Sequence, residues 1–218
     1  SPQKGRGEGL KKGQARPLEA EATDTRAIVE KALKEALKKI EAAFEENTKK
    51  LQKQAENMVA FCHRLNEADF YYQRGDFEKA LSGYESALKL NPSSPSVWDS
   101  KGMALANLGR LQEALEAHIK ATELDPEFAK AWNNQGVALA DLKRYQEALA
   151  AYNTAIKLDP GFANAWYNMA LTSAVLGDKE RMLAGLKKVL LLDSGFKEAA
   201  MEDFEPFLGE KDLKALLE

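Results

Sequence analysis

Apolar and polar positions over most of the chain follow a helical pattern that repeats after 34 residues. Residues 129–162 read AKAWNNQGVALADLKRYQEALAAYNTAIKLDPGF, and they align without gaps on residues 95–128, which read PSVWDSKGMALANLGRLQEALEAHIKATELDPEF. Each copy predicts two short helices joined by a turn, because its apolar residues recur with helical spacing and a Pro near its end stops the second helix. Self-similarity at a period of this size indicates an array of stacked units.

A second period marks residues 23–60. No Gly or Pro occurs between Pro17 and Gly75, and Asp24 can cap the start of a helix. Apolar side chains then recur with alternating spacings of four and three residues, which is the seam of a coiled coil. The seam positions are Leu33, Leu37, Ile40, Phe44, Asn47, Leu51, Gln54, Met58, Phe61 and Leu65. We therefore expect a long helical segment here.

The way in which this helix packs stays open. Asn47 and Gln54 weaken the seam because they are polar. Ala36 and Ala43 lie beside the seam, and such small residues give a wide apolar face that suits packing on other helices. The segment is either a hairpin that breaks at residues 47–48 or one helix that runs unbroken into the first repeat.

Composition and period together predict the domain organisation. We expect a disordered basic linker (1–22), a long coiled-coil-like helix (23–60), four repeats (61–94, 95–128, 129–162 and 163–196) and C-terminal capping helices (197–218). The linker is rich in Gly, Lys and Arg and has almost no large apolar residue to bury. Pro206 and Gly209 are expected to divide the C-terminal segment into two short helices, whose apolar residues can cover the last repeat.

Small residues and Pro recur at fixed positions of the repeat. The eighth position is Ala68, Gly102, Gly136 and Ala170, the twentieth is Ala80, Ala114, Ala148 and Met182, the twenty-seventh is Ala87, Ala121, Ala155 and Val189, and the thirty-second is Pro92, Pro126, Pro160 and Ser194. Small residues at these positions let neighbouring helices approach closely. This register resembles the tetratricopeptide repeat family. The resemblance implies an all-α fold: a right-handed α-solenoid of four helix pairs, with a C-terminal capping helix and a long N-terminal helical segment.

In the family that this register resembles, the first helices of the pairs line a concave groove that binds a peptide or a partner helix. The resemblance places the following residues on that groove: Asn66, Asp69, Tyr72, Asp99, Ser100, Met103, Asn107, Lys130, Asn133, Asn134, Val137, Asp141, Tyr167, Asn168 and Leu171. The sixth position is polar in every repeat, and an Asn there can hold an extended peptide backbone or, alternatively, cap a turn or bind water. The groove has more Asp than Lys, which favours a neutral to basic peptide.

Charge and motifs restrict the function further. The net charge is −3, with 13 Lys and Arg against 10 Asp and Glu in residues 1–60, and 18 against 24 in residues 61–218. Neither part has the strong basic patch of a nucleic-acid-binding protein. The sequence has no catalytic motif, no metal-ligand spacing and no phosphate-binding loop, so we expect neither an enzyme nor a cofactor. His118 takes the place that Tyr84 and Tyr152 have in neighbouring repeats, and we expect it in the core.

We expect no membrane span, because the longest uncharged stretch contains Asn and Gly residues and falls inside the repeat period. A single cysteine, Cys62, excludes an internal disulfide and fits a reducing compartment such as the cytoplasm. The chain begins with Ser, so a processed or secreted form stays open as an alternative.

The sequence thus favours a protein–protein interaction scaffold that binds a peptide or partner helix in the groove. The alternative is a structural role, in which residues 23–60 drive homo-oligomerisation and the repeats are displayed. A disordered basic tail that binds RNA is a third and weaker hypothesis.

Overall fold

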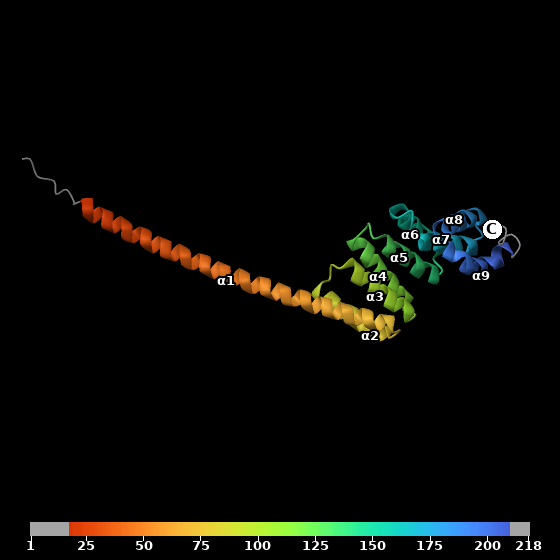
Figure 1. The fold of residues 1–218 in the computed structure, drawn as a ribbon, viewed down its shortest axis with the longest axis horizontal. Coiled ribbons are helices and arrows are strands. Elements are labelled where there is room, and N and C mark those ends of the chain that lie inside the picture. Colours follow the sequence, from red (N-terminus) through yellow and green to blue (C-terminus); the bar gives the residue numbers. More distant parts are fainter. Residues whose placement is uncertain (1–17, 210–218) are drawn as a thin grey trace, which may run out of the picture. The chain divides into compact units, whose positions relative to one another are not determined.

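The computed structural model describes residues 18–209, with side chains from residue 25 onward. Its elements are α1 (Leu18–Gln73), α2 (Phe77–Leu90), α3 (Pro95–Asn107), α4 (Leu111–Leu124), α5 (Ala129–Asp141), α6 (Tyr145–Leu158), α7 (Ala163–Val175), α8 (Lys179–Leu192), the short 3-10 helix η1 (Ser194–Phe196) and α9 (Lys197–Leu208). Every regular element of this part of the chain is helical, as the sequence predicts (Figure 1).

The chain divides into two units, residues 1–55 and residues 56–218. In the second unit the two helices of each later pair, α3 with α4, α5 with α6 and α7 with α8, pack on each other. The second helix of a pair also contacts the first helix of the next pair, and the first helices α3, α5, α7 and α9 contact one another in turn. Figure 1 shows these helices stacked in chain order. The second unit is therefore an α-solenoid of four helix pairs, and this confirms the predicted fold class.

Helix α1 differs from its expected boundaries. It begins at Leu18, upstream of Asp24, so Asp24 lies inside the helix. The reason is local, because Ala is the best helix former and acidic residues such as Glu19 and Glu21 favour the first turn of a helix. The expected linker 1–22 therefore overlaps the helix, and its residues 1–17 lie outside the described part.

The hairpin alternative for residues 23–60 is wrong, since α1 continues without a break through residues 47–48. The hydroxyl of Thr48 donates a hydrogen bond to the Phe44 carbonyl oxygen, one turn earlier, at 2.8 Å. This bond satisfies the hydroxyl inside the helix, where a Thr would otherwise compete for the backbone.

Small residues set how closely the two helices of each pair approach. At the twentieth and twenty-seventh positions the Ala side chains are fully buried. The eighth position of the first helix faces the twenty-third and twenty-fourth positions of the second helix. In every repeat one of positions eight and twenty-three is Gly and the other is Ala: Ala68 with Gly83, Gly102 with Ala117, Gly136 with Ala151, and Ala170 with Gly185. A Cβ atom added to any of these glycines would lie 3.0 Å or less from a neighbouring side chain.

The tryptophan side chains hold the connections between repeats. In three repeats the indole nitrogen of the fourth residue donates a hydrogen bond to the carbonyl oxygen of the Pro six residues earlier. The bonds are Trp98 to Pro92 (2.8 Å), Trp132 to Pro126 (2.9 Å) and Trp166 to Pro160 (3.1 Å). The Pro ends one helix and its free carbonyl positions the aromatic ring that starts the next helix.

The turn inside each pair requires a left-handed residue. Gly75, Gly109 and Gly177 adopt φ values of 77°, 75° and 73° at this point. The third pair has Lys143 here, with φ of 61°. The backbone hydrogen bonds of this turn match those of the turns that contain glycine. Here the Arg144 amide donates to the Leu139 carbonyl oxygen at 2.8 Å. The stack therefore imposes the turn on a residue whose Cβ disfavours it.

The C-terminal segment caps the stack with one described helix. Pro206 lies inside the last turn of α9, so it does not divide the segment as expected, and the helix ends at Gly209 with φ of 77°. Phe204 is fully buried and packs edge-on against the Tyr167 ring of α7. The remaining apolar residues of the expected cap, Leu213, Leu216 and Leu217, lie outside the described residues. In residues 18–209, no helix is both long and apolar enough to cross a membrane.

Replacing Gly136 by Ala is expected to destabilise the array by about 1–3 kcal/mol, because the new Cβ would lie 2.5 Å from the Tyr152 ring. Adding Ala151→Gly recreates the arrangement of the first repeat, where Ala68 faces Gly83 beside Tyr84. The double variant should therefore recover stability, with a coupling energy of about 0.5 kcal/mol or more in urea unfolding. Strictly additive effects of the two substitutions would contradict this account of the packing.

Replacing Lys143 by Gly should stabilise the third repeat by about 1 kcal/mol, because glycine adopts positive φ without the steric penalty of a Cβ. Lys143→Ala is the matched control, since it removes the same charge and side chain but keeps the Cβ. Urea unfolding should show a gain for the glycine variant alone. Equal stabilities of the two variants would show that the turn is not strained.

Candidate functional site

The first helices of successive repeats form a row, and the predicted groove residues lie along it. At the ninth position of the repeat, Met103 on α3, Val137 on α5 and Leu171 on α7 are half-buried. These three apolar side chains recur every 34 residues on helices that contact one another. On α1 the same position is the half-buried Asp69. The row therefore offers a short strip of partly accessible apolar surface.

Polar groove residues flank this strip, and several are open to solvent. Asn66, Asn107, Lys130 and Asp141 are exposed, whereas Ser100 is half-buried. Partial burial raises the pKa of the Asp141 carboxyl above its usual value. Asn66, Lys130 and Asp141 are the exposed polar groups that a ligand on the row can reach most directly, whereas the Asn107 amide makes hydrogen bonds within the array.

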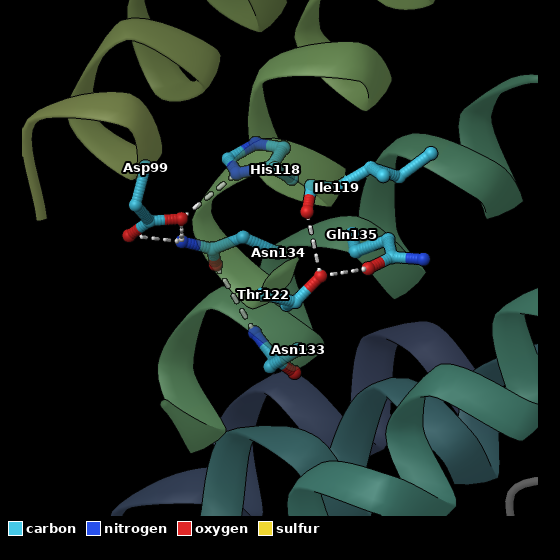
Figure 2. A network of polar contacts seen from close by, with 7 residues as sticks. All are labelled: Asp99, His118, Ile119, Thr122, Asn133, Asn134 and Gln135. Carbon is cyan, nitrogen blue, oxygen red and sulfur yellow. Dashed lines mark hydrogen bonds and ion pairs between the residues drawn. The ribbon is translucent and has the colours of Figure 1, made fainter. Parts of the chain in front are cut away.

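The sixth-position asparagines bridge neighbouring repeats. The Asn134 amide donates to both carboxylate oxygens of Asp99, at 3.0 and 3.1 Å, and the Asn168 amide donates to the Asn133 side-chain oxygen at 3.0 Å. The Asn133 amide in turn reaches the Asn134 oxygen at 3.3 Å, as Figure 2 shows. In both bridges the sixth residue of one repeat meets the fifth residue of the repeat before it. The amide donors of Asn134 and Asn168 are therefore already engaged inside the array.

Among the predicted groove residues that carry a charge, Asp99 is the most deeply buried. It is 2% exposed, and its carboxylate lies 2.8 Å from Nδ1 of His118, which is also 2% exposed. A buried carboxylate needs such partners, because its removal from water is costly. The bond joins α3 to α4 while the Asn134 bond joins α3 to α5 (Figure 2). The prediction that His118 is a core residue is confirmed.

A tyrosine takes the role of His118 in the first repeat. The Tyr84 hydroxyl donates to the Asp69 carboxylate at 2.8 Å, and burial together with this carboxylate raises the pKa of Tyr84. Two of the three groove aspartates, Asp69 and Asp99, thus accept internal hydrogen bonds. The charge of the row that faces solvent is consequently smaller than the sequence suggests.

The remaining predicted residues also make contacts between repeats. The Asn107 amide donates to the Tyr72 hydroxyl at 3.2 Å and to the Met103 carbonyl oxygen at 2.9 Å. Tyr167 is buried, and its hydroxyl donates to the carboxylate of Asp203 on α9. Burial is the main reason that the pKa of Tyr167 is raised.

Helix α9 extends the row, and sequence reasoning missed its part in the site. It contacts α7 as α7 contacts α5, and its half-buried Asp203 accepts the hydrogen bond from the Tyr167 hydroxyl. If the 34-residue period is extended by one more repeat, Lys197 falls at its first position, where the first helix of a further pair would begin. Glu198, Glu202 and Glu205 on this helix are exposed and add negative charge at the C-terminal end.

The described residues contain no group of three or more His, Cys, Asp or Glu side chains that could hold a metal ion. The arrangement instead consists of an apolar strip, exposed amides and charges, and a layer of hydrogen bonds beneath them. Such a surface can hold another molecule by contact along its length.

Comparison with curated proteins gives one partial relative. An uncharacterised protein of Methanocaldococcus jannaschii is 36% identical in an alignment of 55 positions that covers 22% of this chain. The match spans 64% of that relative's length, which is less than two thirds.

Solved structures share the fold at low identity. A thermophilic tetratricopeptide repeat protein from Thermus thermophilus superposes with a TM-score of 0.64 at 22% identity, over 72% of this chain and 87% of that one. YrrB, described as a tetratricopeptide repeat protein with an unusual peptide-binding site, superposes with a TM-score of 0.56 at 20% identity, over 70% of this chain and 80% of its own.

Family models match the repeat array. Three models described as tetratricopeptide repeat match residues 65–122, 129–162 and 151–184, and together they cover more than half of the chain. The match at residues 129–162 coincides with the pair α5 and α6, and the other two matches each span parts of two neighbouring helix pairs. The chain belongs to the tetratricopeptide repeat family.

Proposed function

We propose that this protein is a non-enzymatic interaction scaffold that binds a peptide or a partner helix along the row of first helices. The observation that carries the proposal is the strip formed by Met103, Val137 and Leu171. These side chains are half-buried, so they are fixed in place by the array and still present apolar surface to a ligand. An amphipathic helix or an extended segment with spaced apolar residues fits such a strip.

The polar surroundings of the strip supply orientation. Asn66, Lys130 and Asp141 are exposed and can donate hydrogen bonds to a ligand or accept them from it. In contrast, Asn134 and Asn168 contribute mainly by holding adjacent repeats together, since their amides are engaged. Asp99, Asn133 and Tyr167 are buried and support the surface from below.

The charge of the row favours a neutral to basic partner. Asp141 is exposed, and the exposed Glu198, Glu202 and Glu205 of α9 add negative charge, whereas Lys130 is the exposed cation among the predicted groove residues. A basic segment would meet complementary potential as it approaches this end of the array. The peptide-binding site named for YrrB supports the idea that this fold can hold a peptide.

The alternative function, self-association through residues 23–60, rests on a different surface. Residues 25–59 are exposed in α1 and include large apolar side chains. The two functions are compatible, because they use different parts of the chain.

The apolar strip is tested with a peptide selected from a random display library against the full-length protein. Met103→Gln combined with Val137→Gln should weaken binding of that peptide about tenfold or more, because both apolar contacts are lost; tenfold corresponds to about 1.4 kcal/mol. Fluorescence anisotropy with the labelled peptide measures the affinity. Circular dichroism during heating checks that the variant remains folded.

Ile119→Gln combined with Leu158→Gln is the matched control, since both are exposed apolar residues on the second helices α4 and α6, away from the row of first helices. This control should bind the peptide like the wild type. If the peptide bound the control variant more weakly and the strip variant as tightly as the wild type, the binding site would lie outside the strip.

The charge of the site is tested with Asp141→Lys and a basic selected peptide. The substitution should weaken binding and reduce its dependence on salt, because an attractive charge becomes a repulsive one. Asp125→Lys, at a loop position outside the row, serves as a control of equal charge change. An affinity of the basic peptide that stays the same or rises in the Asp141 variant would show that this carboxylate does not attract the ligand.

A further inference from the structure

Helix α1 carries an apolar stripe on its solvent-exposed part. Every residue from 25 to 59 is exposed, and the large apolar side chains among them are between 51% and 74% exposed. They are Ile28, Val29, Leu33, Leu37, Ile40, Phe44, Leu51, Met58 and Val59. Half of the exposed large hydrophobic residues of the described chain lie on this one stretch. So much apolar surface on one helix indicates a partner.

The stripe has the period of a coiled coil over about four heptads, a length at which this pattern is meaningful. The 4,3 spacing assigns Leu37, Phe44, Leu51 and Met58 to heptad position a and Leu33, Ile40, Asn47 and Gln54 to position d. All four a residues are apolar. The two polar residues both fall at d.

This distribution determines which partner and which orientation fit. In a parallel, in-register pair each d residue faces the same d residue of the other helix, so Asn47 meets Asn47 and Gln54 meets Gln54. Each amide then has both a donor and an acceptor opposite it. In an antiparallel pair d faces a, so both amides would lie against hydrocarbon without a partner. The pattern therefore complements itself in only one of the two orientations.

The flanking positions are also compatible with a second copy. In a parallel pair, position g of one helix approaches position e of the next heptad on the other. The pairs would be Val29 with Lys34, Ala36 with Glu41, Ala43 with Thr48, and Lys50 with Ala55. Each pair contains at most one charge, so no like charges repel. The charges of the outer side pair within the helix, as Lys49 does with Glu45 at 2.8 Å.

We propose that residues 33–58 bind the same residues of a second copy of this chain as a parallel, in-register coiled coil. Asn47 and Gln54 set the register, since a shift by one heptad would place amides opposite apolar side chains. The proposal does not depend on peptide binding by the repeats, because it uses another surface.

Sedimentation equilibrium of the full-length protein tests the association. The chain has a mass of 24.1 kDa, and the wild type should show a concentration-dependent mass that approaches at least twice this value at micromolar concentrations. Leu37→Glu combined with Leu51→Glu should weaken self-association by at least a hundredfold, because charges would occupy the seam. Lys38→Glu combined with Lys53→Glu, on the outer side of the helix, is the control and should associate like the wild type.

Several outcomes would overturn the proposal. These are a wild type that stays monomeric well above micromolar concentration, an unchanged mass for the seam variant, or binding of a monomeric wild type to anionic lipid vesicles through the same residues. The peptide affinity of the seam variant separates the two proposals, since it should equal that of the wild type whether or not the helix associates.

Disulfide trapping tests the orientation. In a Cys62→Ser background, Ile40→Cys should cross-link two chains under mild oxidation, because position 40 faces itself only in the parallel, in-register pair. Lys39→Cys, one residue away on the outer side, should cross-link at least tenfold more slowly. Equal rates for the two variants, or cross-linking of neither, would reject the parallel register.

Discussion

The close approach of paired helices is the constraint on which the array depends. Where Gly102 and Gly136 lie, the facing His118 and Tyr152 rings occupy the space that a Cβ would need. Where the first helix has Ala instead, the glycine moves to the second helix, at Gly83 or Gly185. Each pair thus lacks one methyl group at this contact, although the position of the glycine changes. This spacing then allows the large side chains beside it to be buried completely.

Buried polar groups fix how successive pairs are placed on one another. Apolar packing alone is not directional, whereas the bonds from Asn134 to Asp99 and from Asn168 to Asn133 require one alignment of neighbouring first helices. The same bonds satisfy side chains that would be costly to bury alone. Because the bridges lie beneath the row of first helices, the positions of the surface side chains at Met103, Val137 and Leu171 follow from them.

The two units of the chain use apolar residues in different ways. In the repeats, apolar side chains from several helices enclose one another in packed core clusters. In residues 25–55 the apolar side chains lie on a single helix and remain exposed. An isolated helix cannot bury its own stripe, whereas the helices of the repeats bury theirs against one another.

The sequence by itself determined the helix pairs, the small residues between them and the solenoid class. This is possible because repeats contact mainly their neighbours, so a local pattern repeated every 34 residues specifies the whole stack. Only the tertiary structure decided the fate of the candidate groove residues. Asn134 and Asn168 occupy the sixth position of their repeats, and each bonds the residue at the fifth position of the preceding repeat. This offset of one position depends on how neighbouring helices are staggered. The pairings of Asp99 with His118 and of Tyr167 with Asp203 likewise join residues on separate helices, and side-chain directions across an interface are not encoded in the spacing of either helix alone.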